Sequence, residues 1–490
     1  MIKKNTAFTL ALFISVIFLF SQCTFDKKEM LLPKLVDNSC FPDEVGKIFI
    51  GKCATAGCHN TKSKDAAAGL DMSSYDELFK GSRGGAAIIP YNSTQSFLVN
   101  FINTYSDLGV IQLPTMPNNG TPLSREEVMT VIKWINDGAP DCNGHRFTDN
   151  PDRKKFYITN QGCDLVAVFD AGKKVLMKYV KVGGDPNLIE SPHRVNISPD
   201  GKYWYVSFIG GPYFQKYRTS DDSLVGQVNI GYGSWNTFAF TPDSKFAYLP
   251  DYNSGNQGYV AIVDCETMTL KDFTPFVNPF PSSCPSPHGS FISPDGLSLY
   301  LTKQEGNGLY KIDLPTPYGN DLPVFPNNYS NPHEIAFSPD GTIYFVTCEG
   351  KIGNAGVLVY RVSDDAFLKK IDVAADPVEM AFSLSKPYLF VTCMTGNAVS
   401  IINYQDTTLI KTISNAGFAF PHAIAVDDAN GVCYVASRNI PGSGGPPPHH
   451  TSVCGGADGF LNAIDLNTLE LIPGFKPELS VDPYSIAIRK

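Results

Sequence analysis

Two cysteines and a histidine lie close together in the stretch CATAGCHN, residues 53–60. Covalent attachment of a haem needs two thiols for its two vinyl groups and a histidine directly after the second thiol to reach the iron. Cys53 and Cys58 supply the thiols and His59 the imidazole, although four residues separate the cysteines where the usual motif has two. The stretch predicts a c-type haem site, and the alternative is a disulfide between the two cysteines.

The segments on either side of this stretch have helical patterns. FPDEVGKIFIGKC, residues 41–53, has apolar residues at helical spacing and leads directly into the first thiol. SFLVNFI, residues 96–102, is a second short apolar segment. SREEVMTVIKWINDG opens with the capping box formed by Ser124 and Glu127, and a glycine closes it. We expect a small all-helical domain over residues 41–145.

A methionine flanked by prolines lies in the loop LPTMPNNG, residues 113–120, before the last of these helices. The helix leading into the cysteines, the Met-Pro loop and the closing helix occur in the order that resembles a monohaem cytochrome c domain. This resemblance implies haem c as cofactor, with His59 as the proximal iron ligand and Met116 as the distal one. Thioether ligation raises the haem potential. The alternative for Met116 is an ordinary loop methionine.

From about residue 147 the apolar period falls to two, and one phrase recurs at intervals of 43 to 62 residues. SPHRVNISPDGKYWYV is an example, in which a Pro-Asp-Gly turn joins two short strands. Less regular strands follow each hairpin, so each repeat contains about four strands. The phrase occupies residues 191–206, 235–249, 286–301, 331–346, 376–391 and 420–435.

A seventh inner strand, PYSIAIRK at residues 483–490, has no partner strand after it. Three strands within residues 155–182 have no inner strand before them, so the two ends of this region are expected to share one blade. Such a clasp removes the exposed sheet edges of a linear array. The predicted fold is an all-β seven-bladed propeller over residues 147–490, preceded by the small all-α cytochrome c-like domain.

Aligning the seven inner strands at their start brings four histidines to one mouth of the central channel. The aligned positions are His193, Asn236, His288, His333, Val378, His422 and Tyr484. The loop GSGGPPPHHTSVCGG, residues 442–456, is expected to present His449 and His450 on the same face. Neutral imidazoles from several strands suit a copper, zinc or iron centre. Two hypotheses remain for the mouth: a metal or second haem, and a structural or substrate-binding role.

The recurring phrases resemble YVTN-type propellers, and the order of the two domains resembles the cytochrome nitrite reductases. The histidine-lined mouth is similar to that of nitrous oxide reductase, and this implies copper or another transition metal there. YVTN-type and lactonase propellers with Pro-His at the same strand position imply the metal-free alternative.

The first residues have the pattern of an export signal. Lys3 and Lys4 precede an apolar run over residues 7–20, and Cys23 follows in FLFSQC. This resembles a bacterial lipoprotein signal over residues 1–23, which implies lipidation of Cys23 and a membrane attachment through the lipid. Residues 24–40 would form a tether, and the protein would be an outer-membrane lipoprotein facing the periplasm or the cell surface. The alternatives are simple cleavage and a retained anchor.

The positions of the other cysteines and the net charge also bear on structure and function. Cys40 and Cys142 bracket the helical domain and could pair, while Cys348 and Cys393 occupy equivalent repeat positions that favour packing. A net charge of −9 without a basic block argues against nucleic acid as a partner.

Three functional classes remain. The first is a redox protein, an oxidoreductase if it is an enzyme, with a redox partner protein and chemistry or small-molecule binding at the mouth. The second is a propeller that only binds a partner while the haem relays electrons. The third is a lactonase-like hydrolase, and the haem argues against it.

Overall fold

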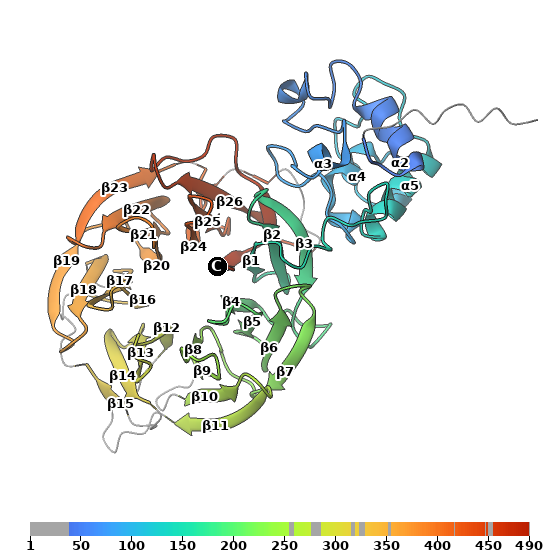
Figure 1. Ribbon diagram of the computed structural model, residues 1–490. Helices are drawn as coiled ribbons and strands as arrows, with labels where there is room; N and C mark the ends of the chain where they lie inside the picture. The colour runs from blue at the N-terminus through green and yellow to red at the C-terminus, as the bar shows by residue number, and fades with distance from the viewer. Residues whose placement is uncertain are drawn as a thin grey trace, which may run out of the picture.

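Seven four-stranded antiparallel sheets surround a central channel in the computed structural model (Figure 1). The structure describes residues 39–489 except 254–258, 276–285, 315–318, 323–328, 351–353, 416, 446 and 449–453. Cys23, the predicted signal and most of the predicted tether therefore lie outside the described residues. The ring of seven blades confirms the predicted propeller.

The blades follow one another around the ring in chain order. The first three contain β28 (Pro483–Ile488), β1 (Lys155–Asn160), β2 (Leu165–Asp170) and β3 (Val175–Lys181); β4 (Pro192–Ile197), β5 (Tyr203–Phe208), β6 (Tyr213–Arg218) and β7 (Leu224–Asn229); and β8 (Ala239–Phe240), β9 (Phe246–Pro250), β10 (Tyr259–Asp264) and β11 (Thr269–Pro275). The next two contain β12 (Pro287–Ile292), β13 (Ser298–Lys303), β14 (Gly308–Asp313) and β15 (Gly319–Asp321); and β16 (Pro332–Phe337), β17 (Ile343–Cys348), β18 (Gly356–Arg361) and β19 (Phe367–Ile371). The last two contain β20 (Pro377–Phe382), β21 (Tyr388–Cys393), β22 (Ala398–Asn403) and β23 (Thr408–Ser414); and β24 (Pro421–Asp427), β25 (Val432–Ser437), β26 (Asp458–Asp465) and β27 (Glu478–Val481).

The Ser-Pro-Asp-Gly turns of the recurring phrase hold their hairpins by side-chain hydrogen bonds. In the first, the Ser198 hydroxyl donates to Asp200 Oδ1 at 2.6 Å, and the backbone N–H of Lys202 donates to the same oxygen at 3.1 Å. Gly201 has φ of 70°, a left-handed conformation that glycine adopts without steric cost. The same turn occurs at residues 293–296 and 338–341, where the serine hydroxyl again donates to the aspartate, and these contacts explain why the turn recurs.

The predicted clasp is present. β28 pairs with β1 in an antiparallel register that places Tyr157 opposite Ala487. The backbone N–H of Ser485 also donates to the Thr159 hydroxyl at 3.0 Å. The blade β28-β1-β2-β3 is therefore built from both ends of the propeller segment, and the ring is closed.

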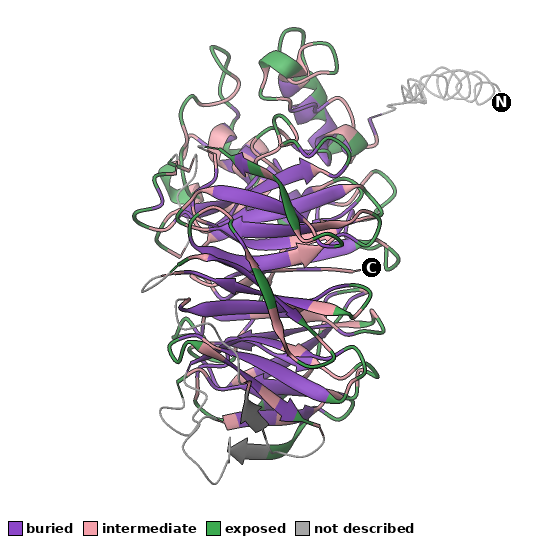
Figure 2. Ribbon diagram, turned by 90° about the vertical axis from the view of Figure 1, so that its left-hand side faces the viewer, coloured by how far each residue is buried: buried purple, intermediate pink, exposed green. Residues whose placement is uncertain are grey.

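Large apolar and aromatic side chains of the blades are buried. The strands of the propeller are accordingly coloured mostly as buried in Figure 2. Trp204 stacks on Tyr217 with ring centroids 4.0 Å apart, and Tyr344 stacks on Tyr360 at 5.0 Å. Cys348 and Cys393 are fully buried free thiols, as expected for cysteines that serve packing. The apolar faces of the blades thus form the core that fixes the channel.

The helical region has eight short elements. They are α2 (Asp43–Ile48), the π-helix η1 (Phe49–Cys53), η2 (Lys64–Ala66), α3 (Tyr75–Leu78), η3 (Ser93–Gln95), α4 (Phe97–Ile102), η4 (Ser106–Leu108) and α5 (Arg125–Asn136) within the described part of the chain. The capping box of α5 is formed by Ser124 and Glu127, as predicted. None of the helices among the described residues is long and apolar enough to span a membrane.

The first and last helices of this region cross through aromatic contacts. Phe49 meets Trp134 edge to face with centroids 5.6 Å apart, and Phe41 meets Phe49 at 5.2 Å. A disulfide between Cys40 and Cys142 joins the two ends of the region, as the sequence suggested. This core holds η1, and therefore Cys53, in place.

The helical region packs beside the outer strands β3 and β27, away from the channel (Figure 1). Phe79 stacks on Phe147 with centroids 4.6 Å apart, and the Arg153 guanidinium lies 4.3 Å from the centroid of the Phe147 ring. The backbone N–H of Glu478, the first residue of β27, donates to the carbonyl oxygen of Gly84 at 3.4 Å. The helical region therefore covers part of two outer sheet edges of the propeller.

Candidate functional site

The three residues of the predicted attachment motif lie together at the end of η1. Cys53 is the last residue of the π-helix and is buried, while Cys58 is exposed in the following loop. The backbone N–H of His59 donates to the Cys53 carbonyl oxygen at 3.1 Å, and this hydrogen bond closes the loop between the two residues. Both cysteines are free thiols, so the alternative disulfide is not formed.

Burial sets the protonation states of Cys53 and His59 in this motif. Burial raises the pKa of the Cys53 thiol to about 12, and the neighbouring Cys58 adds to the rise. Burial lowers the pKa of His59, which favours the neutral imidazole that ligates metals. His59 Nδ1 is buried without a hydrogen-bond partner among the described residues. Buried polar atoms in proteins nearly always have a hydrogen-bond partner. The unpaired nitrogen therefore fits a site at which a bound cofactor supplies the partner.

Met116 lies in the helical region but belongs to a different loop. Its backbone N–H donates to the Phe101 carbonyl oxygen at 2.7 Å, and its partly buried side chain packs against the core of this region. Three large apolar side chains precede it with substantial exposure: Val110 at 48%, Ile111 at 41% and Leu113 at 73%. Exposed apolar side chains in one short loop fit contact with an apolar cofactor or partner.

The four histidines predicted for the channel mouth are brought together by the inner strands. The ring centroids of His288 and His333 are 3.8 Å apart, and those of His193 and His288 are 5.7 Å apart. Tyr484 of β28 lies between His193 and His422, with its ring centroid 3.9 Å from each. All five side chains line one cavity of about 330 Å³. This ring is called the histidine mouth below.

Backbone carbonyls of neighbouring blades orient three of the imidazoles. His193 Nδ1 lies 2.6 Å from the carbonyl oxygen of Asn236, and His422 Nδ1 lies 3.0 Å from that of Tyr484. His288 Nδ1 lies 3.3 Å from the carbonyl oxygen of His333. Because a carbonyl oxygen can only accept, each of these Nδ1 atoms must carry the proton. The Nε2 atom of each neutral ring is therefore a hydrogen-bond acceptor.

Threonines of the second strands donate hydrogen bonds to the backbone carbonyl groups of two mouth histidines. The hydroxyl of Thr159 donates to the His193 carbonyl oxygen at 3.1 Å, and that of Thr392 donates to the His422 carbonyl oxygen at 2.6 Å. Burial lowers the pKa of both histidines well below the ordinary value, so both rings are neutral at pH 7. The rings of His193 and His422 are therefore uncharged, and hydrogen bonds fix their orientation.

The remaining wall of the cavity carries charged and amide side chains. Gln304 Nε2 donates to Glu349 Oε1 at 2.6 Å, and the same oxygen lies 3.8 Å from His333 Nε2. Arg438 donates two hydrogen bonds to Asp482, at 2.6 and 2.9 Å, and its guanidinium lies 4.8 Å from the Tyr484 ring centroid.

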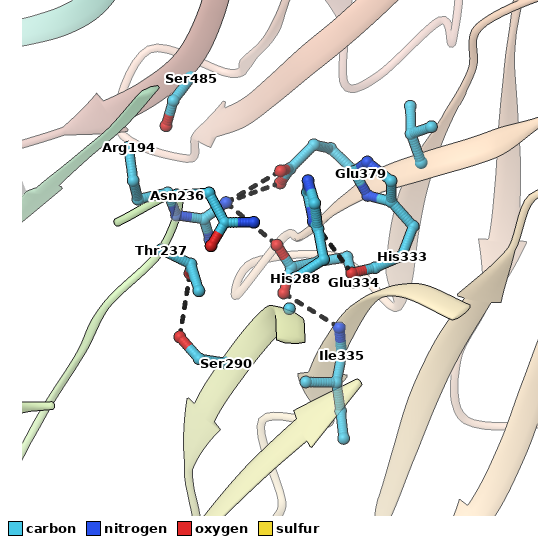
Figure 3. Close-up of polar contacts among 12 residues, drawn as sticks. Arg194, Asn236, Thr237, His288, Ser290, His333, Glu334, Ile335, Glu379 and Ser485 are labelled. Carbon is cyan, nitrogen blue, oxygen red and sulfur yellow. Dashed lines mark hydrogen bonds and ion pairs between the residues drawn. The ribbon is translucent and has the colours of Figure 1, made fainter. Parts of the chain in front are cut away.

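A buried ionic cluster lies next to the histidine mouth inside the channel (Figure 3). Arg194 Nη1 donates to Glu334 Oε2 at 3.0 Å and to the two Glu379 oxygens at 2.9 and 3.1 Å. Burial and the neighbouring Glu379 raise the pKa of Glu334, although Arg194 opposes the rise. The sequence analysis missed this cluster. Each of its members directly follows an aligned mouth position, and reading one residue further along the inner strands would have found it.

The predicted metal at the mouth is not supported by a ligand cluster. Among the described residues, no group of three or more histidine, cysteine, aspartate or glutamate side chains is arranged to hold a metal ion. His449 and His450 lie outside the described residues, so their predicted place on this face stays a prediction. The structure therefore brings His193, His288, His333 and His422 together and leaves the metal hypothesis open.

One comparison with known proteins concerns the helical region. Residues 56–117 match the family model of Planctomycete cytochrome C. The matched segment contains Cys58, His59 and Met116, and begins after Cys53. A chain from Leptospira interrogans, Antigen Lp49, is 26% identical over 98 residues, which is 20% of this chain and 20% of that protein.

A further comparison concerns the fold. The Kuenenia stuttgartiensis Hydrazine Synthase structure is similar with a TM-score of 0.49 and 17% identity, covering 59% of this chain and 90% of that one. This likeness says nothing about the chemistry of the present chain. The matched cytochrome segment and the seven blades together indicate a haem protein of the electron-transfer kind, with a cytochrome c-like region ahead of a β-propeller.

Proposed function

We propose that this protein is an exported electron-transfer protein with one covalently attached haem c in its helical region. Cys53 and Cys58 would form the thioether bonds, and His59 and Met116 would ligate the iron. The haem would supply a one-electron redox couple, and a thioether ligand raises its potential into the range used for electron transfer. The observation that carries the proposal is the segment of two free thiols followed by a half-buried imidazole whose lowered pKa favours the neutral form and whose Nδ1 has no hydrogen-bond partner among the described residues.

The protein environment would tune this site through burial and packing. The neutral state of His59 keeps its nitrogen lone pair available at pH 7, because burial disfavours the imidazolium. The exposed side chains of Val110, Ile111 and Leu113 would provide apolar cover beside Met116 or a contact surface for a redox partner protein.

The histidine mouth would bind a small ligand. Its support is the cavity of about 330 Å³, the fixed imidazole orientations and the polar groups that line it. The helical region packs on the outer strands rather than on the cavity lining, so ligand binding and electron transfer would occupy separate places on the molecule. Lipidation of Cys23 and an outer-membrane location remain part of the proposal.

Expression with a haem-maturation system tests the main claim. We expect a covalent haem that survives denaturing electrophoresis, and a single Cys58→Ser substitution should leave only one thioether bond. His145→Ala is the matched control, because His145 is exposed and outside the motif. A protein that carries no covalent haem under these conditions would contradict the proposal. Labelled palmitate should enter the wild-type protein but not Cys23→Ser, and equal labelling of both would contradict lipidation.

A further inference from the structure

We propose that the histidine mouth selects a small organic cation, a primary ammonium on a short carbon skeleton. The inference rests on the proposed ligand role of the mouth and adds the class of ligand. It follows from the fixed proton positions of the imidazoles, the excess of carboxylates around the cavity and the mixed polar and apolar lining.

The first step concerns hydrogen-bond polarity. His193 and His422 each use Nδ1–H to donate to a backbone carbonyl of a neighbouring blade. Their Nε2 lone pairs have no recorded partner within the described chain, and both rings line the cavity. A ligand that meets these rings must therefore donate hydrogen bonds. An ammonium group has three N–H donors and no acceptor, which matches this arrangement.

The Tyr484 ring strengthens the match. Its ring centroid lies 3.9 Å from the centroids of both His193 and His422, and its hydroxyl oxygen lies 3.4 Å from His288 Nε2. Because His288 Nδ1 carries the proton, Nε2 accepts and the tyrosine hydroxyl donates. The oxygen of Tyr484 then keeps its lone pairs as further acceptors. An aromatic ring beside a cation also adds a favourable electrostatic interaction.

The second step concerns charge. Two arginines and four carboxylates surround the site. Arg438 and Glu349 line the cavity, and Asp482 binds Arg438. Arg194, Glu334 and Glu379 form the adjoining cluster in the channel. Arg438 is held by Asp482 through two hydrogen bonds, and Arg194 is shared between Glu334 and Glu379. The carboxylates remain in excess even if one of them is protonated. An anionic ligand would therefore be repelled, while a cation would be attracted.

The third step concerns size and apolar contact. A cavity of about 330 Å³ is at the small end for ligand sites, and its wall includes Ile209, Val378 and Met394. These side chains offer an apolar surface for a short hydrocarbon chain. A bare metal ion suits the site less, because no described group of three or more metal-binding side chains converges on one point.

Calorimetric titration at pH 7 of the haem-loaded protein with n-butylammonium, 1-butanol and n-butyrate tests the inference. We expect butylammonium to bind with a 1:1 stoichiometry and about 10-fold or more tighter than butanol, because hydrogen bonds from a charged donor contribute more than neutral ones. Butyrate should show no binding. Equal or tighter binding of butyrate would overturn the charge assignment, and absence of butylammonium binding would overturn the inference.

Substitution of one acceptor locates the binding. His422→Phe keeps a flat ring but removes the Nε2 acceptor, so it should weaken butylammonium binding about 10-fold or more. His145→Phe, on the exposed surface, is the matched control and should leave binding unchanged. Thermal unfolding of both variants checks the fold, and if His422→Phe does not fold, the comparison of the three probes on wild-type protein still decides. Unchanged affinity in a folded His422→Phe would place the ligand elsewhere.

Two further measurements separate the outcomes. Stoichiometric binding of zinc alone that is lost in His193→Phe would assign the mouth to a metal and overturn the ammonium proposal. Covalent haem is quantified in the same preparation. A haem-loaded protein that binds butyrate in place of butylammonium would keep the proposed electron-transfer function and a ligand site, and would refute only the choice of cation.

Discussion

The guanidinium of Arg194 lies 3.0 Å from the carboxylate of Glu334, and the same Nη1 atom contacts Glu379. One cation therefore faces two carboxylates in the enclosed channel. Burial and Glu379 raise the pKa of Glu334 to about 8, with Arg194 acting in the opposite direction. The folded protein thus binds a proton that the unfolded chain releases near the ordinary glutamate pKa.

This difference predicts a fall in stability with rising pH. The contribution of Glu334 is fully present below the unfolded pKa and is lost as the pH rises through about 8. Glu334→Gln should remove this loss, which is on the order of 5 kcal/mol because the pKa rises from 4.5 to about 8 and each pKa unit corresponds to about 1.4 kcal/mol. Urea unfolding between pH 5 and 9 measures it, with the exposed Glu305→Gln as control. Parallel pH curves for wild type and Glu334→Gln would contradict the proton assignment.

Gly289 of β12 provides the space that this cluster needs. A Cβ atom there would lie 2.7 Å from the His333 carbonyl oxygen and 2.8 Å from Glu334 Cα. Gly289→Ala should therefore destabilise the protein by about 1–3 kcal/mol through overpacking. Gly308→Ala is the control, because its nearest atom would be 3.6 Å away, at ordinary van der Waals distance. Equal unfolding midpoints for the two variants would show that β12 and β16 can move apart without cost.

The disulfide between Cys163 and Cys454 joins the β1–β2 turn to the segment before β26. Replacing both cysteines by serine should lower the free energy of unfolding by about 2–4 kcal/mol, as for other cross-links that close long loops. Denaturant unfolding of the oxidised wild type and the double variant measures this loss. Reduction of the wild type would also open the Cys40–Cys142 disulfide, so both proteins are compared under oxidising conditions. A double variant as stable as oxidised wild type would mean that the clasp strands alone hold this edge.

Met116→Ala should lower the haem potential and leave covalent attachment intact, because the thioether ligand favours the reduced iron. Redox titration and the methionine-to-iron absorption band follow the change. Met129→Ala is the matched control, since Met129 is an exposed helix residue. If Met116→Ala and Met129→Ala have the same potential and spectrum as wild type, the distal ligand must be another residue.

Phe147 connects the helical region to the propeller. Its ring stacks on Phe79, and the cationic groups of Arg153 and Lys173 lie 4.3 and 5.0 Å from its centroid. Phe147→Ala should cost about 3 kcal/mol, the usual loss for a buried aromatic ring, and should separate the unfolding of the two parts. Calorimetry would then show two transitions. A single unshifted transition would indicate that the contacts of Gly84 with β27 suffice.

Repetition explains why the fold was predictable from the sequence. The phrase around Pro-Asp-Gly encodes its own turn, since the Ser198 and Asp200 side chains form hydrogen bonds within the turn itself. The clasp was predictable because β28 lacked a following partner and β1 a preceding one. The mouth histidines were found because the repeats could be aligned on a shared strand position.

The remaining features depend on contacts between blades that no local pattern encodes. The proton on His193 Nδ1 is fixed by the carbonyl oxygen of Asn236 in the next blade. This contact can be predicted only when the relative position of the two neighbouring sheets is known. The pairing of Cys163 with Cys454 could not be chosen from twelve cysteines. The ionic cluster combines residues from three inner strands, and only an alignment of the repeats at the position after the mouth residues brings them together.

The pairing of β28 with β1 also determines when the histidine mouth can form. Ser485 bonds to Thr159 across 326 residues of chain, and Tyr484 beside it forms one wall of the cavity. The ring therefore stays open, with the edge of β1 unprotected, until β28 pairs with it. Truncated translation products that stop before Pro483 would lack both closure and cavity, and their bare edge strand would mark them for aggregation or proteolysis. Binding of a ligand at the mouth would accordingly report that β28 has closed the ring.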